Sequence, residues 1–318
     1  MALIGAFVLQ LLQMLLVLTL APGLVGLVRK VKARLLRRRG PAILQPYRDF
    51  ARLLRKETVL ADNASWLFRV APYLIFAAIW VAAALTPTFA TGLLFSWSGD
   101  IIAIIALLGS ARFFLALAGM DIGTSFGGLG SSREMMIASL AEPAMLMIVF
   151  SLALIAGSTA LSTMAEYMAS PEVGLRVSLG LALIALVIVA LAENARIPVD
   201  NPATHLELTM VHEAMVLEYS GRHLALIDLS AQLKLLLYVS LIACLFVPWG
   251  IAGPDAGLKA MLIGVVAFIA KLAAGGFLLA VFETSIAKMR VFRVPEFMGV
   301  ALMLALLATL LLFVSRSL

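Results

Sequence analysis

The stretch ENARIPVDNPATHLELTMVHEAMVLEYSGRHLALID runs from Glu193 to Asp228, between two long runs of leucine, alanine, isoleucine and valine. An ionisable group at the centre of a membrane helix costs roughly 2.5–3.5 kcal/mol on insertion scales. Charged groups gathered at the mouth of a helix bundle therefore indicate proton handling, ion handling or a docking surface. The charged and titratable residues of this acidic loop include Glu193, Arg196, Asp200, His205, Glu207, His212, Glu213 and Glu218.

The composition is that of an integral membrane protein. Hydrophobic residues make up 63% and charged residues 13% of the chain, whereas soluble domains have about 45–50% apolar and about 25% charged residues. Cys244 is the single cysteine. The chain therefore has no internal disulfide and no thiolate set for an iron–sulfur cluster of its own.

A bilayer core about 30 Å thick needs about 20 apolar residues per helix. The sequence predicts an all-α membrane protein with about eight transmembrane helices, an amphipathic helix and a polar helical loop, forming one membrane domain over residues 1–318. The helices are expected near 3–27, 70–92, 100–120, 138–160, 175–193, 231–252, 258–282 and 297–315. The cytoplasmic loops are expected at 28–69, 121–137, 194–230 and 283–296.

The distribution of basic residues predicts the orientation. Half of the 24 lysines and arginines lie between Arg29 and Arg69, and half of the others follow the third, fifth and seventh expected helices. Cytoplasmic loops carry an excess of Lys and Arg, so we expect these loops in the cytoplasm and both termini on the other side. The net charge of +6 then follows from topology and requires no nucleic acid.

Two polar segments outside the helices have a predictable form. RDFARLLRKETVL, from Arg48 to Leu60, is typical of an amphipathic helix lying on the membrane surface, although an ordinary charged loop helix has the same pattern. Pro198 and Pro202 predict an extended turn, followed by a helix from Thr204 to about Tyr219.

No motif in the chain indicates catalysis, a bound cofactor or a metal. The pair His212–Glu213 would need a second histidine at position 216 for the zinc-protease motif, but that residue is Val216. GTSFGGLGSS, from Gly123 to Ser132, is rich in glycine but follows a membrane helix instead of a strand. It is interpreted as a tight connecting loop, not as a phosphate-binding loop.

Ionisable residues inside the expected helices are candidates for an ion pathway. Glu142 opens the fourth helix, Glu193 closes the fifth and Lys271 interrupts the seventh, and chains of such groups with water between them form proton relays. For Arg112, Lys234 and Glu283, a static ion pair or a snorkelling side chain explains the residue at least as well. The predicted ion-pathway and coupling residues are Glu142, Glu193, Glu207, Glu213, Glu218 and Lys271.

Four segments carry a resemblance to a known family. RRRGPAILQPYRDFARLLRKE (Arg37 to Glu57) and ENARIPVD with LEYSG (Glu193 to Gly221) resemble loops of the quinone-site membrane subunit of respiratory complex I and its hydrogenase relatives. ALAGMDIGTSFGGLGSSREMMIASLAEP (Ala116 to Pro143) and FETSIAKMRVFRVPE (Phe282 to Glu296) resemble the hydrogenase branch. That branch comprises membrane subunits of energy-converting group 4 nickel–iron (NiFe) hydrogenases, of the formate hydrogenlyase subunit 4 and hydrogenase-4 component C type.

The resemblance implies a non-catalytic subunit of a prokaryotic inner-membrane complex, without an active site or cofactor of its own. It implies partners: hydrogenase large and small subunits with iron–sulfur proteins, which carry the [NiFe] centre and the clusters, and antiporter-like membrane subunits. Glu142, Glu193 and Glu218 match acidic positions of the family. The chain would anchor the peripheral arm and couple electron transfer to proton or sodium translocation. The implied arm interface is Arg37, Arg38, Arg39, Asp49, Arg196 and Asp200.

Other readings stay open at this point. The chain could be the quinone-site subunit of a complex I-like oxidoreductase, but only three residues separate Gly40–Pro41 from Gln45–Pro46, fewer than in quinone-reducing relatives. It could also serve a hydrogenase-related complex without nickel. A free-standing transporter would show broken helices or paired repeats, and the sequence shows neither. The ion, the electron donor and the roles of His205 and His212 are not decided by the sequence.

Overall fold

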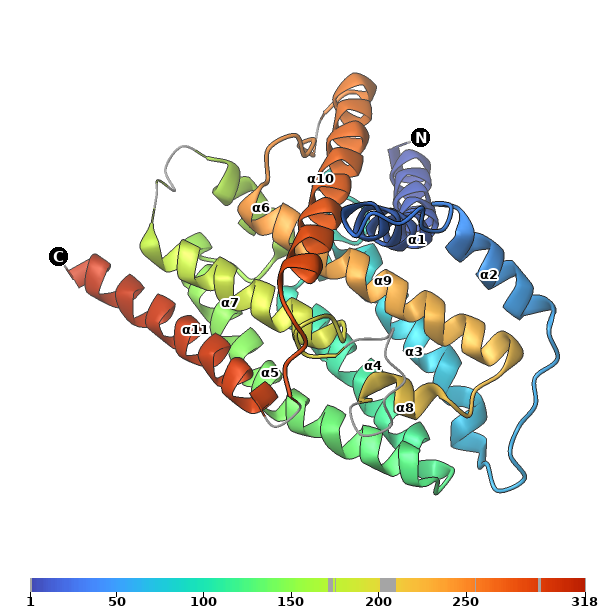
Figure 1. The fold of residues 1–318 in the computed structure, drawn as a ribbon. Helices are drawn as coiled ribbons and strands as arrows, with labels where there is room; N and C mark the ends of the chain where they lie inside the picture. Colours follow the sequence, from blue (N-terminus) through green and yellow to red (C-terminus); the bar gives the residue numbers. More distant parts are fainter. Residues whose placement is uncertain are drawn as a thin grey trace.

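The computed structural model describes residues 2–170, 174, 176–200, 210–254, 256–290 and 293–317. This part of the chain is helical (Figure 1) and has only two isolated β-bridges, which confirms the predicted all-α class. In chain order the elements are α1 (Ala2–Leu35), α2 (Gln45–Arg55), α3 (Trp66–Leu85), the short 3₁₀ helix η1 (Ser96–Ser98), α4 (Ile101–Asp121), α5 (Ser125–Ala156), α6 (Leu161–Ala169), α7 (Val177–Glu193), α8 (His212–Val216), α9 (Gly221–Phe246), α10 (Leu258–Ser285) and α11 (Val294–Ser317).

Within the described residues, seven helices are long and apolar enough to cross a membrane. They are α1, α3, α4, α5, α9, α10 and α11, and the shorter apolar helix α7 is the eighth candidate. This arrangement agrees with the expected bundle of about eight transmembrane helices. α9 is the most enclosed of the seven, with 78% of its apolar window buried, whereas α10 has 22%. α9 is therefore the central helix, and α10 lies at the edge of the bundle (Figure 1).

Contacts between loops define two ends of the bundle. At one end, the bridges Ala90–Ala252 and Asp100–Ala160 join the connections that follow α3, α5 and α9. At the other end, the Ser65 amide donates to the Asp121 carboxylate at 3.0 Å, and the Met289 amide donates to the Pro198 carbonyl at 2.9 Å. We call the second end the acidic-loop end, because α7 ends there at Glu193 and α9 begins there.

Side-chain caps fix where several of these helices begin. Ser65, Asp100 and Thr124 each accept a hydrogen bond from a backbone amide in the first turn of α3, α4 and α5. Such caps satisfy amides that have no partner within the helix. Because Thr124 starts α5 at Ser125, the prediction of a loop over 121–137 is wrong from Ser125 onward, and the expected fourth helix begins 13 residues earlier than its predicted start at 138.

Close helix packing explains the glycines of α5. A Cβ atom at Gly127 would lie 2.1 Å from the Gly119 carbonyl oxygen, and one at Gly130 would lie 2.9 Å from the Val211 carbonyl oxygen. Small residues allow helix backbones to approach closely in membrane proteins. The glycine-rich stretch is therefore a contact of α5 with α4 and with the segment before α8, not a connecting loop.

Two further expectations change in detail. The amphipathic helix is present as α2, but it runs over Gln45–Arg55 and packs against α1 and α9. The helix expected from Thr204 to about Tyr219 is limited to α8 (His212–Val216) within the described residues, and residues 201–209 lie outside them. His205 and Glu207, which belong to this predicted helix, therefore fall outside the described residues.

The LEYSG motif attaches the end of the acidic loop to the first turn of α3 and to the segment before it. Tyr219 stacks on Phe68 with ring centroids 3.9 Å apart and donates to the Phe68 carbonyl oxygen at 3.1 Å. The Ser220 hydroxyl binds both the amide and the carbonyl of Val59 at 2.8 Å. Gly221 has φ +52, and a Cβ atom there would lie 2.6 Å from the Glu57 carbonyl oxygen. The motif thus has a structural role that explains its serine and glycine.

We expect Gly221→Ala to destabilise the protein strongly. Positive φ costs a residue with a Cβ roughly 1–2 kcal/mol, and the contact with the Glu57 carbonyl adds a steric penalty. The measurement is thermal unfolding of the purified protein in mild detergent. Gly123→Ala is the matched control, because Gly123 has φ +71 but nothing within 4 Å of a Cβ atom. Equal losses in the two variants would contradict the proposed contact.

Candidate functional site

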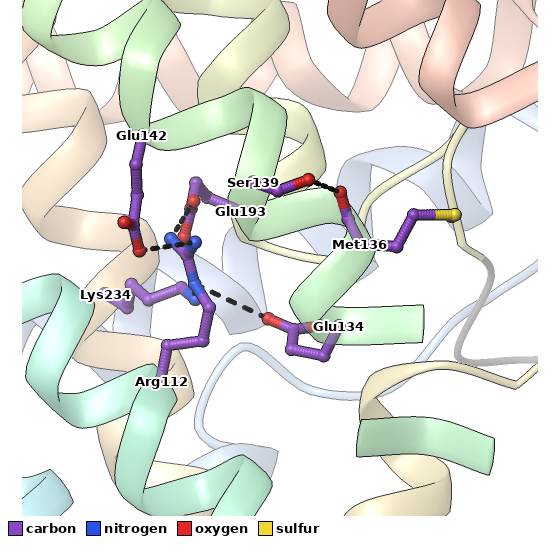
Figure 2. A network of polar contacts seen from close by, with 7 residues as sticks. All are labelled: Arg112, Glu134, Met136, Ser139, Glu142, Glu193 and Lys234. Atoms are coloured by element: carbon purple, nitrogen blue, oxygen red, sulfur yellow. Dashed lines mark hydrogen bonds and ion pairs between the residues drawn. The ribbon is translucent and has the colours of Figure 1, made fainter. Parts of the chain in front are cut away.

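A buried arginine stands at the centre of the candidate site. Arg112 lies on α4 and is 6% exposed. A charge in this position requires partners, because neither lipid nor the protein interior solvates it. Its guanidinium points at three carboxylates (Figure 2): it donates to Glu193, lies 3.4 Å from Glu142 Oε1 through Nη1, and lies 3.7 Å from Glu134 Oε1 through Nε.

Glu193 is shared between two cations. As the last residue of α7, it accepts from Arg112 with Oε1, and its Oε2 lies 3.4 Å from the Nζ atom of Lys234 on α9. The side chain of Glu193 is only 3% exposed. We call Arg112, Glu134, Glu142, Glu193 and Lys234 the buried charge cluster; its members come from α4, α5, α7 and α9.

The cluster constrains the fold as well as any function. Removing one partner of a buried ion pair typically costs about 3–5 kcal/mol, because the remaining charge stays buried and unpaired. Here one guanidinium serves three carboxylates and one carboxylate serves two cations. The four helices must therefore meet in one arrangement for the charges to compensate each other.

A small cavity lies beside the cluster and extends it toward the acidic loop. Its volume is about 50 Å³, enough for a few water molecules. One wall is apolar and includes Ile75 and Leu115. The polar lining is formed by Arg112, Glu134, Glu193, Asn194, His212 and Lys234. The cavity therefore places titratable groups of the membrane helices next to the loop residues Asn194 and His212.

His212 is a neutral group in this setting. Burial, followed by the nearby positive charge of Lys234, lowers the pKa of His212 from 6.5 to about 4. At neutral pH its imidazole thus carries no charge and can both donate and accept a hydrogen bond. This is the chemistry of a proton-conducting group. The described residues contain no group of three or more His, Cys, Asp or Glu that could hold a metal ion.

Glu142 connects the cluster to the outer surface of the bundle. Its side chain is 48% exposed although it also contacts Arg112. It lies over Gly109, where an added Cβ would approach Glu142 Oε1 to 3.5 Å. Exposed apolar side chains follow on the same face of α5, at Leu146 and Phe150. One carboxylate in an apolar, outward-facing surface is suited to exchange protons with a neighbouring subunit.

A second set of contacts holds the start of the acidic loop at its rim. Glu283 near the end of α10 is 3.0 Å from Lys32 of α1 and 3.4 Å from Arg196. Lys288 lies 3.1 Å from the Asp200 carboxylate. With the Met289–Pro198 backbone bond, these rim contacts fix residues 196–200 against α1, α10 and the connection to α11.

The structure brings only some of the predicted pathway residues together. Glu142 and Glu193 both join the buried charge cluster. Lys271 is partly exposed on α10 and takes part in none of the ion pairs found in the described ranges. Glu213 is half-buried in α8 and Glu218 is exposed after it. Glu207 lies outside the described residues.

The predicted arm-interface residues fall into two groups. Arg37, Arg38 and Arg39 are exposed after the end of α1. Asp49 lies within α2, where it pairs with Arg52 at 3.2 Å. Arg196 and Asp200 instead bind other parts of this chain through the rim contacts. These ion pairs tie both residues to the position of the loop.

Sequence reasoning missed the role of Arg112, Lys234 and Glu134. For Arg112 and Lys234, a static ion pair or a snorkelling side chain explains the sequence at least as well as a functional role, because spacing does not show that α4 and α9 converge on Glu193. Glu134 was placed in an expected loop, where a carboxylate needs no explanation. The available signal was the helix cap at Thr124, which extends α5 back through Glu134.

Comparisons with known proteins agree with this architecture. The family described as NADH dehydrogenase matches residues 8–314. Formate hydrogenlyase subunit 4 of Escherichia coli is 34% identical over 287 residues, covering 90% of this chain and 92% of that protein. Hydrogenase-4 component C of Escherichia coli is 34% identical over 300 residues, covering 93% and 92%.

The fold also matches a solved structure. A chain of the membrane-bound sulfane sulfur reductase, an archaeal respiratory membrane complex, superposes with a TM-score of 0.80 at 19% identity, covering 97% of this chain and 99% of the other. At that identity the match shows the fold alone. The family match and the two bacterial relatives show more: this chain belongs to the NADH dehydrogenase family and is homologous to the membrane subunits of formate hydrogenlyase and hydrogenase-4.

Proposed function

We propose that this chain is the membrane subunit of a membrane-bound nickel–iron hydrogenase complex. It anchors the peripheral redox arm, which carries the nickel–iron centre and iron–sulfur clusters, and couples electron transfer to translocation of protons or sodium ions. The homology to formate hydrogenlyase subunit 4 and hydrogenase-4 component C supports this assignment. The acidic-loop end faces the cytoplasm and both termini face the other side of the membrane.

The observation that carries the proposal is the buried charge cluster. A subunit that served only as an anchor could pack its helices with apolar side chains, which are often equally or more stabilising than buried ion pairs. Here α4, α5, α7 and α9 bring together five ionisable residues in ion pairs, and four of the five are buried. Charged groups retained inside membrane proteins mark ion pathways and relays.

The geometry suggests how the loop controls the cluster. Glu193 ends α7 and begins the loop that the rim contacts hold. A change of charge in the arm above the loop displaces residues 196–200. That displacement alters the distances from Glu193 to Arg112 and Lys234, and with them the proton affinity of Glu193. When the two cations move away, Glu193 takes up a proton, which then passes by way of Glu142 to an antiporter-like neighbour.

We assign the contact surface for the peripheral arm to the acidic-loop end of the bundle. Arg37, Arg38 and Arg39 are exposed there, and complementary charge on a partner would orient it during docking. The rim contacts place the acidic loop beside this basic segment through Lys32. Lys271 stays a predicted coupling residue of α10, separate from the cluster.

We expect Glu193→Gln and Glu142→Gln to stop ion translocation while the complex still assembles. Both changes keep side-chain shape and remove the exchangeable charge. The measurement is ion uptake into liposomes containing the purified complex, per electron pair transferred. Glu166→Gln, an exposed residue of α6, is the matched control. Unchanged translocation in both cluster variants would contradict the coupling role.

Purification of the tagged subunit in mild detergent tests the identity of the complex. We expect a hydrogenase large subunit and nickel in the purified material. A complex of similar composition without nickel would contradict the hydrogenase assignment and favour a related redox module. Capture of a quinone-reducing peripheral arm would instead favour the complex I-like alternative.

A further inference from the structure

We propose that Glu134 holds an exchangeable proton at neutral pH and is the group through which the cavity loads the buried charge cluster. This inference rests on the proposed coupling function and adds a proton-holding residue to it. Glu134 is on α5, eight positions before Glu142, a rise of about 12 Å along the helix. Arg112 bridges the two residues.

The buried charge cluster contains more carboxyl groups than cations. Arg112 and Lys234 supply two positive charges, which the buried carboxyl groups of Glu134 and Glu193 share with Glu142, whose side chain is 48% exposed. His212 adds none when it is neutral. An uncompensated buried charge is so costly that a titratable group changes its protonation state instead. One carboxyl group of the cluster is therefore expected to carry a proton.

The contacts of the three carboxylates identify which one. Glu193 binds both cations, and Glu142 accepts a hydrogen bond from Arg112 at 3.4 Å. Among the ion pairs and hydrogen bonds of the described residues, Glu134 has a single approach, 3.7 Å to Arg112 Nε, which is beyond hydrogen-bond distance. The side chain of Glu134 is 8% exposed, so water solvates it poorly. Of the three, Glu134 is the least compensated as a carboxylate.

The groups that face Glu134 from neighbouring elements are consistent with this assignment. Arg112 approaches from α4, Glu193 from α7 and Lys234 from α9, while Asp200 contributes a further negative charge from the loop after α7. His212 of α8 lies across the cavity. The preceding residue, Arg133, is directed to the Met210 carbonyl oxygen at 2.7 Å. Its hydrogen bond is thus made outside the cluster.

Two buried polar atoms lie on the proposed route of the proton from Glu134 into the cavity. Arg112 Nε and Asn194 Oδ1 have no hydrogen-bond partner in the described part of the chain, and both residues line the cavity with Glu134. When the O–H bond of protonated Glu134 breaks, the proton passes to water in the cavity, and Asn194 Oδ1 accepts a hydrogen bond from that water. The carboxylate left behind can then accept from Arg112 Nε. This new ion pair draws the guanidinium away from Glu193. Ionisation of Glu134 therefore weakens the interaction of Arg112 with Glu193.

Infrared spectroscopy of the purified complex tests the proposal without requiring ion transport. A protonated carboxyl group has a carbonyl stretching band separate from the amide bands. We expect the difference spectrum of wild type minus Glu134→Gln at neutral pH to contain such a band, sensitive to exchange into heavy water. Glu134→Asp should retain the band at a shifted frequency. The control Glu166→Gln should leave the band unchanged.

Several outcomes would overturn the assignment. Absence of the band from the difference spectrum would show that Glu134 is ionised. Loss of the band in Glu142→Gln, with an unchanged band in Glu134→Asp, would place the proton on Glu142. If Glu134→Gln does not assemble, the frequency shift in Glu134→Asp decides the question alone. If the carboxyl band is assigned to Glu134 but the wild-type complex takes up no ions, the coupling function is refuted. The assignment of a proton to Glu134 would still hold.

Discussion

The ion pair between Arg112 and Glu193 is the constraint on which the rest of the structure depends. It joins α4 to the end of α7, and Lys234 of α9 binds the same carboxylate. Because the three charges lie among apolar helices, each is tolerable only while the others are in place. The positions of α4, α7 and α9, and the point at which the acidic loop leaves the membrane, follow from this requirement.

The two ends of the acidic loop are held in different ways. The rim contacts hold the beginning of the loop against α1 and α10 through ion pairs. At the end of the loop, Tyr219 stacks on the first turn of α3, and Ser220 forms hydrogen bonds with the segment before α3. Ion pairs respond to a change in nearby charge, and apolar stacking does not. The loop thus has one electrically sensitive attachment, next to Glu193, and one rigid attachment.

The sequence predicted the helices well because apolar runs of about 20 residues have few alternative structures near a bilayer. It predicted Glu142 and Glu193 as special because a carboxylate inside such a run is costly. It did not predict the start of α5, since glycines that permit close packing look like loop residues when the partner helix is unknown. Glu134 lies before the predicted start of that helix, so its position in the cluster was not predicted either. The convergence of Arg112 and Lys234 depends on long-range packing, which periodicity does not encode.

The decisive measurement uses the double variant Arg112→Gln/Glu193→Gln, which removes both charges of the pair. Lys234 then loses Glu193, and Glu134 and Glu142 lose Arg112, but the excess of negative charge is smaller than in Arg112→Gln alone. We expect the double variant to assemble and to be more stable than Arg112→Gln alone, yet to translocate no ions per electron pair transferred. Stability recovered without ion movement would show that the pair serves coupling as well as folding. Ion translocation at the wild-type ratio would contradict a role of the pair in coupling, because the cluster would then have a structural role only.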